Sequence, residues 1–264
     1  MINTEGAKRF DLKSEIFTGA SYVTSFWHDL HSAFFSPGRV SSRVRLRKLL
    51  PKESLYRLVP PLLKEISVMQ IPVSEIVSVS DDEIDRAVAT LVMAFASDPI
   101  VRWMYEDSYS YLVHMPELFG ALATSCLRAR TAYQTDDGLG VALWLPPGDR
   151  GDDSQVETVI RNSLSAEMRS EIGSLLEEVE RYRPSEPHWY LSLIGVEAIN
   201  QGKGRGSSLL QYSLRQCDKN HHAAYLWSSN KQNIPFYERA GFRMVRTIQV
   251  GSAPSIYPMI RAAR

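Results

Sequence analysis

The sequence predicts a mixed α/β domain, a sheet with helices packed on it, preceded by a helical extension. Two observations carry this prediction. β-like and helical segments alternate along the chain after residue 72, and glycine- or proline-rich turns separate them. The 264 residues suffice for one large domain or for one domain with an extension. We therefore divide the chain into an N-terminal extension, residues 1–72, and a main domain, residues 73–264.

The elements of the main domain are expected in the order β-α-α-β-β-α-β-α-β-α-β-β. A β-like segment from Val73 to Val79 comes first. A helix with its apolar residues on one face then runs from Ile84 to Phe95, and Ser97-Asp98-Pro99 ends it. Further helices are expected over 109–128 (or from Pro116), 165–182, 207–217 and 234–240, and further strands over 131–134, 139–145, 189–196, 224–228, 242–250 and 255–261. The turn Asp136-Asp137-Gly138 predicts a hairpin.

The N-terminal extension differs in composition from the main domain. Aromatic residues concentrate before Pro37-Gly38, and the stretch from Arg39 to Lys64 holds eight basic residues against one acidic residue, Glu53. Such a segment could dock on an acidic partner or an anionic membrane surface. A helical extension packed on the main domain, with solvated arginines, is the preferred interpretation. Whether residues 1–72 form part of the domain, a homodimer contact or a partner site stays open.

The charge balance and the two cysteines argue against several classes of protein. Basic and acidic residues number 30 each, so no global field favours nucleic acid as a partner. Charged residues interrupt the first thirty positions, and no apolar run approaches the length of a membrane span. Cys126 and Cys217 have no metal-binding spacing and are expected to be buried, reduced thiols. We therefore expect a cytoplasmic protein with no integral membrane segment.

The most informative stretch is Gln201–Ser207, which follows a hydrophobic run and precedes a helical pattern. Its three glycines leave the backbone without Cβ atoms, so N–H groups can converge on an anion at the start of the next helix. The spacing fits neither the Walker A loop nor the dinucleotide fingerprint G-x-G-x-x-G, because Ser207 or Leu209 stands where that fingerprint needs glycine. The loop predicts a phosphate site of another kind, with an ordinary glycine-rich turn as the alternative.

The residues after the loop point to a family by resemblance. The chain reads Val196, then Gln201-x-x-Gly204-x-Gly206, then Asn233-x-x-Phe236-Tyr237-x-x-x-Gly241-Phe242. These motifs resemble the acetyl-CoA-binding core of the GNAT N-acetyltransferase superfamily. The amino-acid sequences of residues 233–242 and 142–148 are similar to those of the puromycin N-acetyltransferase group. The resemblance covers residues 73–261 and implies the GNAT fold, a mixed, mostly antiparallel central sheet flanked by helices.

The resemblance also implies an activity. Such an enzyme moves acetyl from acetyl-CoA to a primary amine by direct attack, here on a small-molecule acceptor, without a metal. A protein or peptide acceptor and a non-catalytic acetyl-CoA-binding module are the alternatives. The strand before the loop is expected to bulge and to splay from the next strand, so that its backbone pairs with the pantetheine arm. The implied cofactor-binding residues are Ile194, Val196, Gln201, Gly202, Lys203, Gly204, Arg205, Gly206, Ser207 and Asn233.

Tyr237 is, by the same resemblance, the general acid that protonates the departing thiolate. A phenol with a pKa of about 10 and a thiol with a pKa of about 8.5 make that proton transfer close to balanced. The general base is not assigned. Relatives of the puromycin type commonly carry glutamate where this chain has Trp227, so a carboxylate base from that strand is in doubt.

His188 is a candidate base because its ordinary pKa lies near neutrality. By the period of two along a strand, His188 and Tyr190 are expected to share a face with Ile194 and Val196. A structural role for His188, a role for Glu197 and a water chain stay open as alternatives. Five aromatic residues either line the acceptor pocket or form core, namely Trp103, Tyr133, Trp144, Tyr190 and Trp227.

Overall fold

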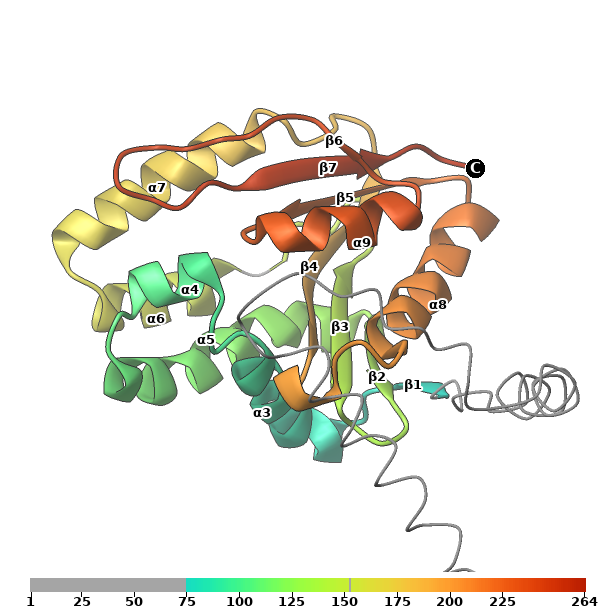
Figure 1. Cartoon of the computed structure of the whole chain (residues 1–264), viewed down its shortest axis with the longest axis horizontal. Coiled ribbons are helices and arrows are strands. Elements are labelled where there is room, and N and C mark those ends of the chain that lie inside the picture. Colours follow the sequence, from blue (N-terminus) through green and yellow to red (C-terminus); the bar gives the residue numbers. More distant parts are fainter. Residues whose placement is uncertain (1–74, 152) are drawn as a thin grey trace, which may run out of the picture. The chain divides into compact units, whose positions relative to one another are not determined.

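The structure is a computed structural model that describes residues 75–151 and 153–264 (Figure 1). A seven-stranded sheet in the order β1-β2-β3-β4-β5-β7-β6 forms its centre. The strands are β1 Ile76–Ser78, β2 Ala132–Thr135, β3 Gly140–Leu145, β4 His188–Val196, β5 Ala223–Ser228, β6 Arg243–Met244 and β7 Tyr257–Arg261. Only β4 and β5 are parallel neighbours within this sheet. The predicted mixed, mostly antiparallel sheet is confirmed, whereas the expectations for residues 1–72 lie outside the described residues.

Helices cover both faces of the sheet. They are α3 Ile84–Ala94, α4 Pro99–Met104, α5 Ser108–Arg128, α6 Asp153–Ser163, α7 Ala166–Glu180, α8 Arg205–Lys219 and α9 Ile234–Arg239. In Figure 1, α3 and α5 lie to one side of β3 and β4, and α8 lies to the other. One buried cluster joins α3, α5 and α6 to the sheet, and a second joins α8 and α9 to the opposite face. Both clusters include residues of β4, which is therefore packed on both of its faces.

Two helices were not predicted, and one was predicted in alternative forms. α4 begins directly after Asp98, whose side chain accepts hydrogen bonds from the backbone N–H groups of Ile100 and Val101 at 3.0 and 3.2 Å. Asp98-Pro99 therefore starts a helix as well as ending the previous segment. α6 was also missed, although Val156, Val159 and Ile160 recur at helical spacing and pack against one core cluster. α5 runs unbroken through Pro116, so the start at that proline was wrong.

The strand predicted over 242–250 is much shorter than expected. β6 contains two residues, and the chain then makes an isolated bridge between Ile248 and Ile256 before β7. Those two isoleucines pack with Leu175 and Val179 of α7 instead of continuing the sheet. Part of the predicted strand 242–250 therefore packs on α7, because the burial of apolar side chains outweighs the local preference for strand conformation.

β4 contains the expected bulge. Its antiparallel register with β3 shifts between Leu143 and Trp144: Leu193 pairs with Leu143, and Leu191 pairs with Trp144. Ser192 is the extra residue on β4, so the strand bends and its side-chain alternation changes phase at that point.

This change of phase corrects one expectation. Ile194 and Val196 pack in the cluster on the α8 face, whereas Tyr190 packs in the cluster under α3 and α5. His188, two residues before Tyr190, lies on the same side of the strand as Tyr190. The prediction that His188 and Tyr190 share a face with Ile194 and Val196 was wrong, because the bulge interrupts the period of two.

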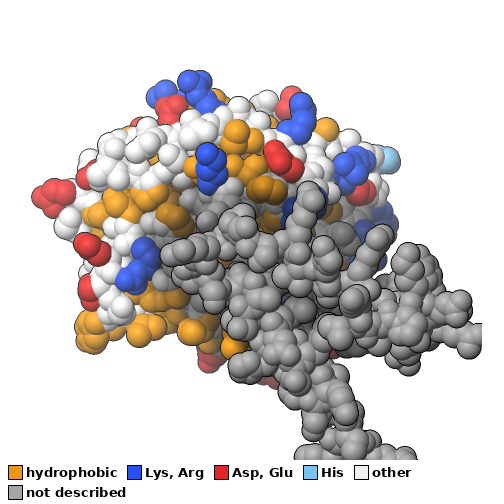
Figure 2. All heavy atoms as spheres, in the orientation of Figure 1, with side chains coloured by type: hydrophobic (Ala, Val, Ile, Leu, Met, Phe, Trp, Pro, Cys, Tyr) orange, Lys and Arg blue, Asp and Glu red, His pale blue; other side chains and the backbone are white. Residues whose placement is uncertain are grey.

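The splay between β4 and β5 is also confirmed. The two strands pair over only three residues each, and the last pair is Tyr190 with Tyr225. Toward the carboxyl end of β4 the partner on that side is therefore missing within the described sheet. Both cysteines are free and buried, as predicted, and within the described residues no helix is long and apolar enough to cross a bilayer. On the face in Figure 2, basic and acidic side chains of the described residues are interspersed.

Candidate functional site

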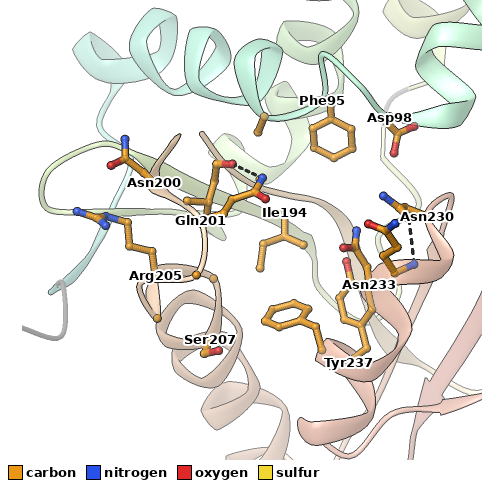
Figure 3. Close-up of a pocket in the computed structure, with 18 of the residues that line it drawn as sticks. Phe95, Asp98, Ile194, Asn200, Gln201, Arg205, Ser207, Asn230, Asn233 and Tyr237 are labelled. Atoms are coloured by element: carbon orange, nitrogen blue, oxygen red, sulfur yellow. Dashed lines mark hydrogen bonds between the residues drawn. The ribbon is translucent and has the colours of Figure 1, made fainter. Parts of the chain in front are cut away.

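A cavity of about 610 Å³ opens where β4 and β5 part (Figure 3). Four segments far apart in the sequence form its walls: the end of β4, the loop from η3 (Ala198–Asn200) into α8, the junction of α3 and α4, and η4 (Lys231–Asn233) with α9. The lining residues include Phe95, Asp98, Ile194, Gly195, Val196, Gln201, Gly202, Gly204, Arg205, Gly206, Ser207, Asn230, Asn233, Phe236, Tyr237 and Arg239.

The glycine loop presents unpaired backbone donors to this cavity. Gly202 and Gly204 have φ angles of +73° and +86°, and Gly204 is the residue that precedes the first turn of α8. No heavy atom lies within 4 Å of a Cβ placed at either glycine, so backbone conformation and not space requires glycine there. The first N–H groups of α8 have no partners within the helix. Together with the helix dipole they are the kind of group that can bind an anion.

Two side chains hold the loop in place. The Gln201 amide donates to the Val196 carbonyl at 3.0 Å, which ties the loop back to β4. Arg205 donates to one carboxylate oxygen of Asp137 through Nε at 2.9 Å and Nη2 at 2.6 Å. Burial alone would raise the pKa of Asp137, but the hydrogen bonds from Arg205 and Thr135 lower it to about 2. The predicted hairpin turn therefore also anchors the loop.

The edge of β4 offers backbone groups to the cavity. The N–H of Glu197 donates to the Leu139 carbonyl on the β3 side at 3.1 Å. Antiparallel pairs alternate in direction, so the backbone groups of Val196 and Ile194 point the other way, toward the missing part of β5. Gly195 lies between them, and a Cβ there would approach the Ala94 Cβ to 2.7 Å. A glycine at this position lets α3 pack closely on the strand.

Tyr237 and Asn233 form the wall opposite β4, as Figure 3 shows. The Tyr237 ring is 6% exposed and makes edge-to-face contacts with Phe236 and Phe242 at centroid distances of 5.0 and 6.1 Å. Burial, and to a lesser degree the charge of Asp98, raises the pKa of the Tyr237 hydroxyl above its ordinary value. The phenol is therefore protonated at neutral pH.

Asp98 is the one carboxylate among the described residues that line the cavity. It lies between α3 and α4, on the far side of the cavity from Arg205 and Ser207 (Figure 3). Its Oδ2 accepts a hydrogen bond from the hydroxyl of Ser229, directly after β5. Burial raises the pKa of Asp98 although the hydrogen bonds oppose the shift. The sequence indicated only a helix boundary here, and an acidic residue before proline was the available signal.

Comparisons with known proteins agree with this geometry. Residues 157–262 match the family model of the acetyltransferase (GNAT) domain. An uncharacterized N-acetyltransferase of Schizosaccharomyces pombe is 28% identical over 173 residues, covering 60% of this chain and 69% of the relative. These matches support an N-acetyltransferase whose residues 157–262 are similar to the GNAT domain.

Solved acetyltransferases share its fold. Arylalkylamine N-acetyltransferase 2 of Aedes aegypti superposes with a TM-score of 0.54 at 16% identity, over 72% of this chain and 99% of that one. A Corynebacterium glutamicum protein described as histone acetyltransferase HPA2 and related acetyltransferase superposes with a TM-score of 0.53 at 21% identity, over 72% and 97% of the two chains. The fold of this acetyltransferase domain therefore extends beyond the matched residues 157–262.

The structure gathers most of the predicted site residues of this acetyltransferase around one cavity. Those that line it are Ile194, Val196, Gln201, Gly202, Gly204, Arg205, Gly206, Ser207, Asn233 and Tyr237. Lys203 is not among the lining residues, and its ammonium group donates to the Asn200 side chain at 3.2 Å. That lysine is exposed.

His188 also lies away from the cavity lining. Its Nδ1 donates to the Glu186 carbonyl at 2.8 Å, and its Nε2 accepts from Arg183 Nε at 3.0 Å. Burial lowers the pKa of His188. The six residues that separate it from Ile194 along β4 correspond to about 20 Å of strand. Both ring nitrogens are therefore engaged, at the end of β4 that is remote from the glycine loop.

The five aromatic candidates divide into two groups. Trp144 and Tyr133 are 0% and 7% exposed and belong to the core under α8. Tyr190, Trp227 and Trp103 are half-buried on the opposite side of the sheet, and Trp103 donates to Ser252 at 3.1 Å. None of the five lines the described cavity.

Proposed function

We propose that this N-acetyltransferase transfers the acetyl group of acetyl-CoA to the primary amine of a small molecule by direct attack. One observation supports this most strongly. A single cavity joins the unpaired first turn of α8, the unpaired edge of β4 and the buried hydroxyl of Tyr237. An anion site, a backbone edge and a proton donor are what a thioester of a pyrophosphate-containing carrier requires.

The residues of the cavity offer partners for two parts of acetyl-CoA, the pyrophosphate and the pantetheine arm. The backbone N–H groups around Gly204, Gly206 and Ser207 would bind the pyrophosphate, with Arg205 held alongside by Asp137. The backbone groups of Ile194 and the N–H of Val196 would pair with the amides of the pantetheine arm, because the Val196 carbonyl already accepts from Gln201. Asn233, on the facing wall, would hydrogen-bond the same arm from the other side.

Tyr237 would supply the proton that the departing thiolate takes up. Its raised pKa keeps the phenol protonated at neutral pH, but makes the transfer to a thiolate less favourable than for an ordinary tyrosine. The transfer therefore depends on the thiolate developing directly beside the phenol. His188 receives no role in this scheme, because both its ring nitrogens are engaged elsewhere and it does not line the cavity.

A small-molecule acceptor is preferred over a protein acceptor. The amino-acid sequence of residues 233–242 resembles that of the puromycin N-acetyltransferase group. Solved enzymes with this fold include proteins named for arylalkylamines and for agmatine, although another is described as a histone acetyltransferase. The free, buried thiols of Cys126 and Cys217 are consistent with a reducing, cytoplasmic location.

The test is a panel of acceptors with the full 264-residue chain. Release of free CoA from acetyl-CoA would be followed with arylalkylamines, agmatine, polyamines and puromycin, and in parallel with lysine-containing and free N-terminal peptides. Turnover with one class of small amine, together with mass-spectrometric detection of its N-acetyl product, is the expected result. Turnover confined to peptides would replace the small-molecule proposal with the protein alternative. CoA binding without turnover on any amine would favour a non-catalytic module.

A further inference from the structure

The proposed reaction needs a group that takes a proton from the acceptor, because an alkylamine is an ammonium ion at neutral pH and cannot attack in that form. The strand position where a glutamate was expected holds Trp227. Asp98 lines the cavity together with Tyr237, where burial and, to a lesser degree, the charge of Asp98 raise the pKa of the Tyr237 hydroxyl. A carboxylate and the proposed acid therefore lie in one cavity, on different walls.

The surroundings of Asp98 hold it in a defined position. Its Oδ1 caps α4 by accepting from the N–H groups of Ile100 and Val101, and its Oδ2 accepts from the Ser229 hydroxyl. Ser229 directly follows β5, the strand that parts from β4. The hydrogen bond to Ser229 therefore ties the α3–α4 junction to the end of β5. A carboxylate oxygen can accept more than one hydrogen bond, so Asp98 can also accept one from an ammonium group in the cavity.

We infer that Asp98 binds the acceptor as its ammonium ion and accepts the proton that the amine must lose before it attacks. This inference rests on the proposed function and names the class of substrate for the same site, a cationic primary amine. It assigns the general base to the junction of α3 and α4 instead of to the strands beside the cofactor.

The protons and bonds balance as follows. The ammonium ion gives one proton to Asp98, and the neutral amine then attacks the thioester carbonyl, so that a C–N bond forms. The C–S bond breaks, and the thiolate takes the proton of Tyr237. Nitrogen loses its second proton as the amide forms, and that proton restores the phenol of Tyr237 through water. Asp98 finally returns its proton to solvent, and the products are N-acetylamine and free CoA.

The electrostatic surroundings support a base at this position. Burial is the largest effect on Asp98 and raises its pKa, which makes the carboxylate a stronger base than an exposed one. Tyr237, Arg205 and Arg239 line the cavity with Asp98, and the charge of Asp98 also acts on Tyr111 of α5.

The experiment compares Asp98→Asn with Asp107→Asn. Both aspartates cap a helix, and asparagine retains a capping oxygen, but Asp107 is exposed and does not line the cavity. With an arylalkylamine acceptor, D98N is expected to lower kcat/KM about 100-fold or more at pH 7, while D107N stays within two-fold of the wild type. The dissociation constant for CoA, measured by calorimetry, should change less than three-fold in both variants.

An aryl amine such as aniline provides the decisive control, because it is already neutral at pH 7 and needs no base before attack. D98N should therefore retain turnover of an aryl amine to within a few-fold. A second variant, Ser229→Ala, removes a hydrogen bond that stabilises the carboxylate. Because loss of this hydrogen bond raises the pKa of Asp98, the acidic limb of the kcat/KM profile should move to higher pH. This variant tests whether Asp98 is the base even if D98N does not fold.

Three results would overturn the inference. The first is a D98N enzyme that acetylates the arylalkylamine as well as the wild type does. The second is an equal loss for aryl amine and alkylamine, which would indicate a structural role. The third is an unmoved acidic limb in Ser229→Ala. Failure of the wild type to acetylate any amine would instead overturn the proposed function, and this inference with it.

Discussion

The two ends of the cavity are built in opposite ways. The end around Gly204 comes from one continuous segment, in which a loop and the first turn of a helix present backbone groups. The end around Asp98 joins the α3–α4 junction to Ser229, a residue 131 positions away in the chain. A site made of backbone groups restricts which residue types can stand at adjacent positions in the sequence. A site made of one carboxylate places almost no restriction on the residues beside it in the sequence. The first end is therefore visible in the sequence, and the second is not.

The largest effect on activity is expected at Tyr237, which lines the same cavity as both ends. Tyr237→Phe removes the hydroxyl but keeps the ring contacts with Phe236 and Phe242. We expect kcat to fall about 100-fold, because the thiolate loses its proton donor, while CoA affinity stays within two-fold. Tyr212→Phe, on α8 and outside the cavity lining, is the matched control. Wild-type kcat in Y237F would remove this residue from the mechanism.

A pH profile sharpens the same assignment. The pKa of Tyr237 is raised above its ordinary value of about 10. Ionisation of this phenol should therefore not lower kcat in wild-type enzyme as the pH rises from 8 to about 10. A basic limb that lies below pH 10 and disappears in Y237F would contradict the raised pKa.

Gly195 tests a constraint that comes from packing alone. A Cβ at this position would meet the Cβ of Ala94 at 2.7 Å and the Leu91 side chain at 3.3 Å. Gly195→Ala is expected to destabilise the fold by about 1–3 kcal/mol through overpacking. Chemical denaturation would measure it, with Gly120→Ala in α5 as the control, because nothing lies within 4 Å of that Cβ. Unchanged stability in G195A would mean that α3 can move away without cost.

Gly204 tests a constraint that comes from backbone conformation alone. Gly204 and Gly173 both have open space where an added Cβ would lie, but only Gly204 has a positive φ. Gly204→Ala should cost about 1–2 kcal/mol at the loop and weaken CoA binding about ten-fold. Gly173→Ala, on α7, should instead stabilise the helix by about 0.5–1 kcal/mol. Equal effects of the two substitutions would show that the loop does not need its left-handed residue.

The smallest effect is expected at Asp137, which ties the loop to the hairpin. Asp137→Asn should lower stability by about 1 kcal/mol at pH 7, a value reduced because the pair is partly exposed. The folded-state pKa of Asp137 is about 2, below the unfolded value of about 3.9. The stabilisation is therefore complete above pH about 4 and disappears as the pH falls toward 2. A difference between D137N and wild type that persists unchanged to pH 2 would contradict this.

The elements whose signals are local were predicted well. α3 and α8 were found from their apolar faces, and the hairpin at Asp137 from its turn residues. α4 was missed because six residues are too few to show a period. The length of β6 was overestimated because Ile248 and Ile256 bury against α7 instead of extending the sheet.

By itself, the sequence predicted the glycine-loop end of the cavity. Glycines at 202, 204 and 206 and the motif from Asn233 to Phe242 were sufficient, because backbone conformation and helix-terminal donors depend on residue type at fixed local spacing. In the structure, the glycine loop, Asn233, Phe236 and Tyr237 lie around one cavity.

The tertiary structure alone decided what faces that site. The bulge at Ser192 places His188 and Tyr190 on the other side of β4 from Ile194. The packing of the α3–α4 junction against the end of β5 brings Asp98 to the cavity. Register shifts and contacts between distant segments are set by the free energy of the whole packed core, and a single carboxylate in a loop carries no local trace of them.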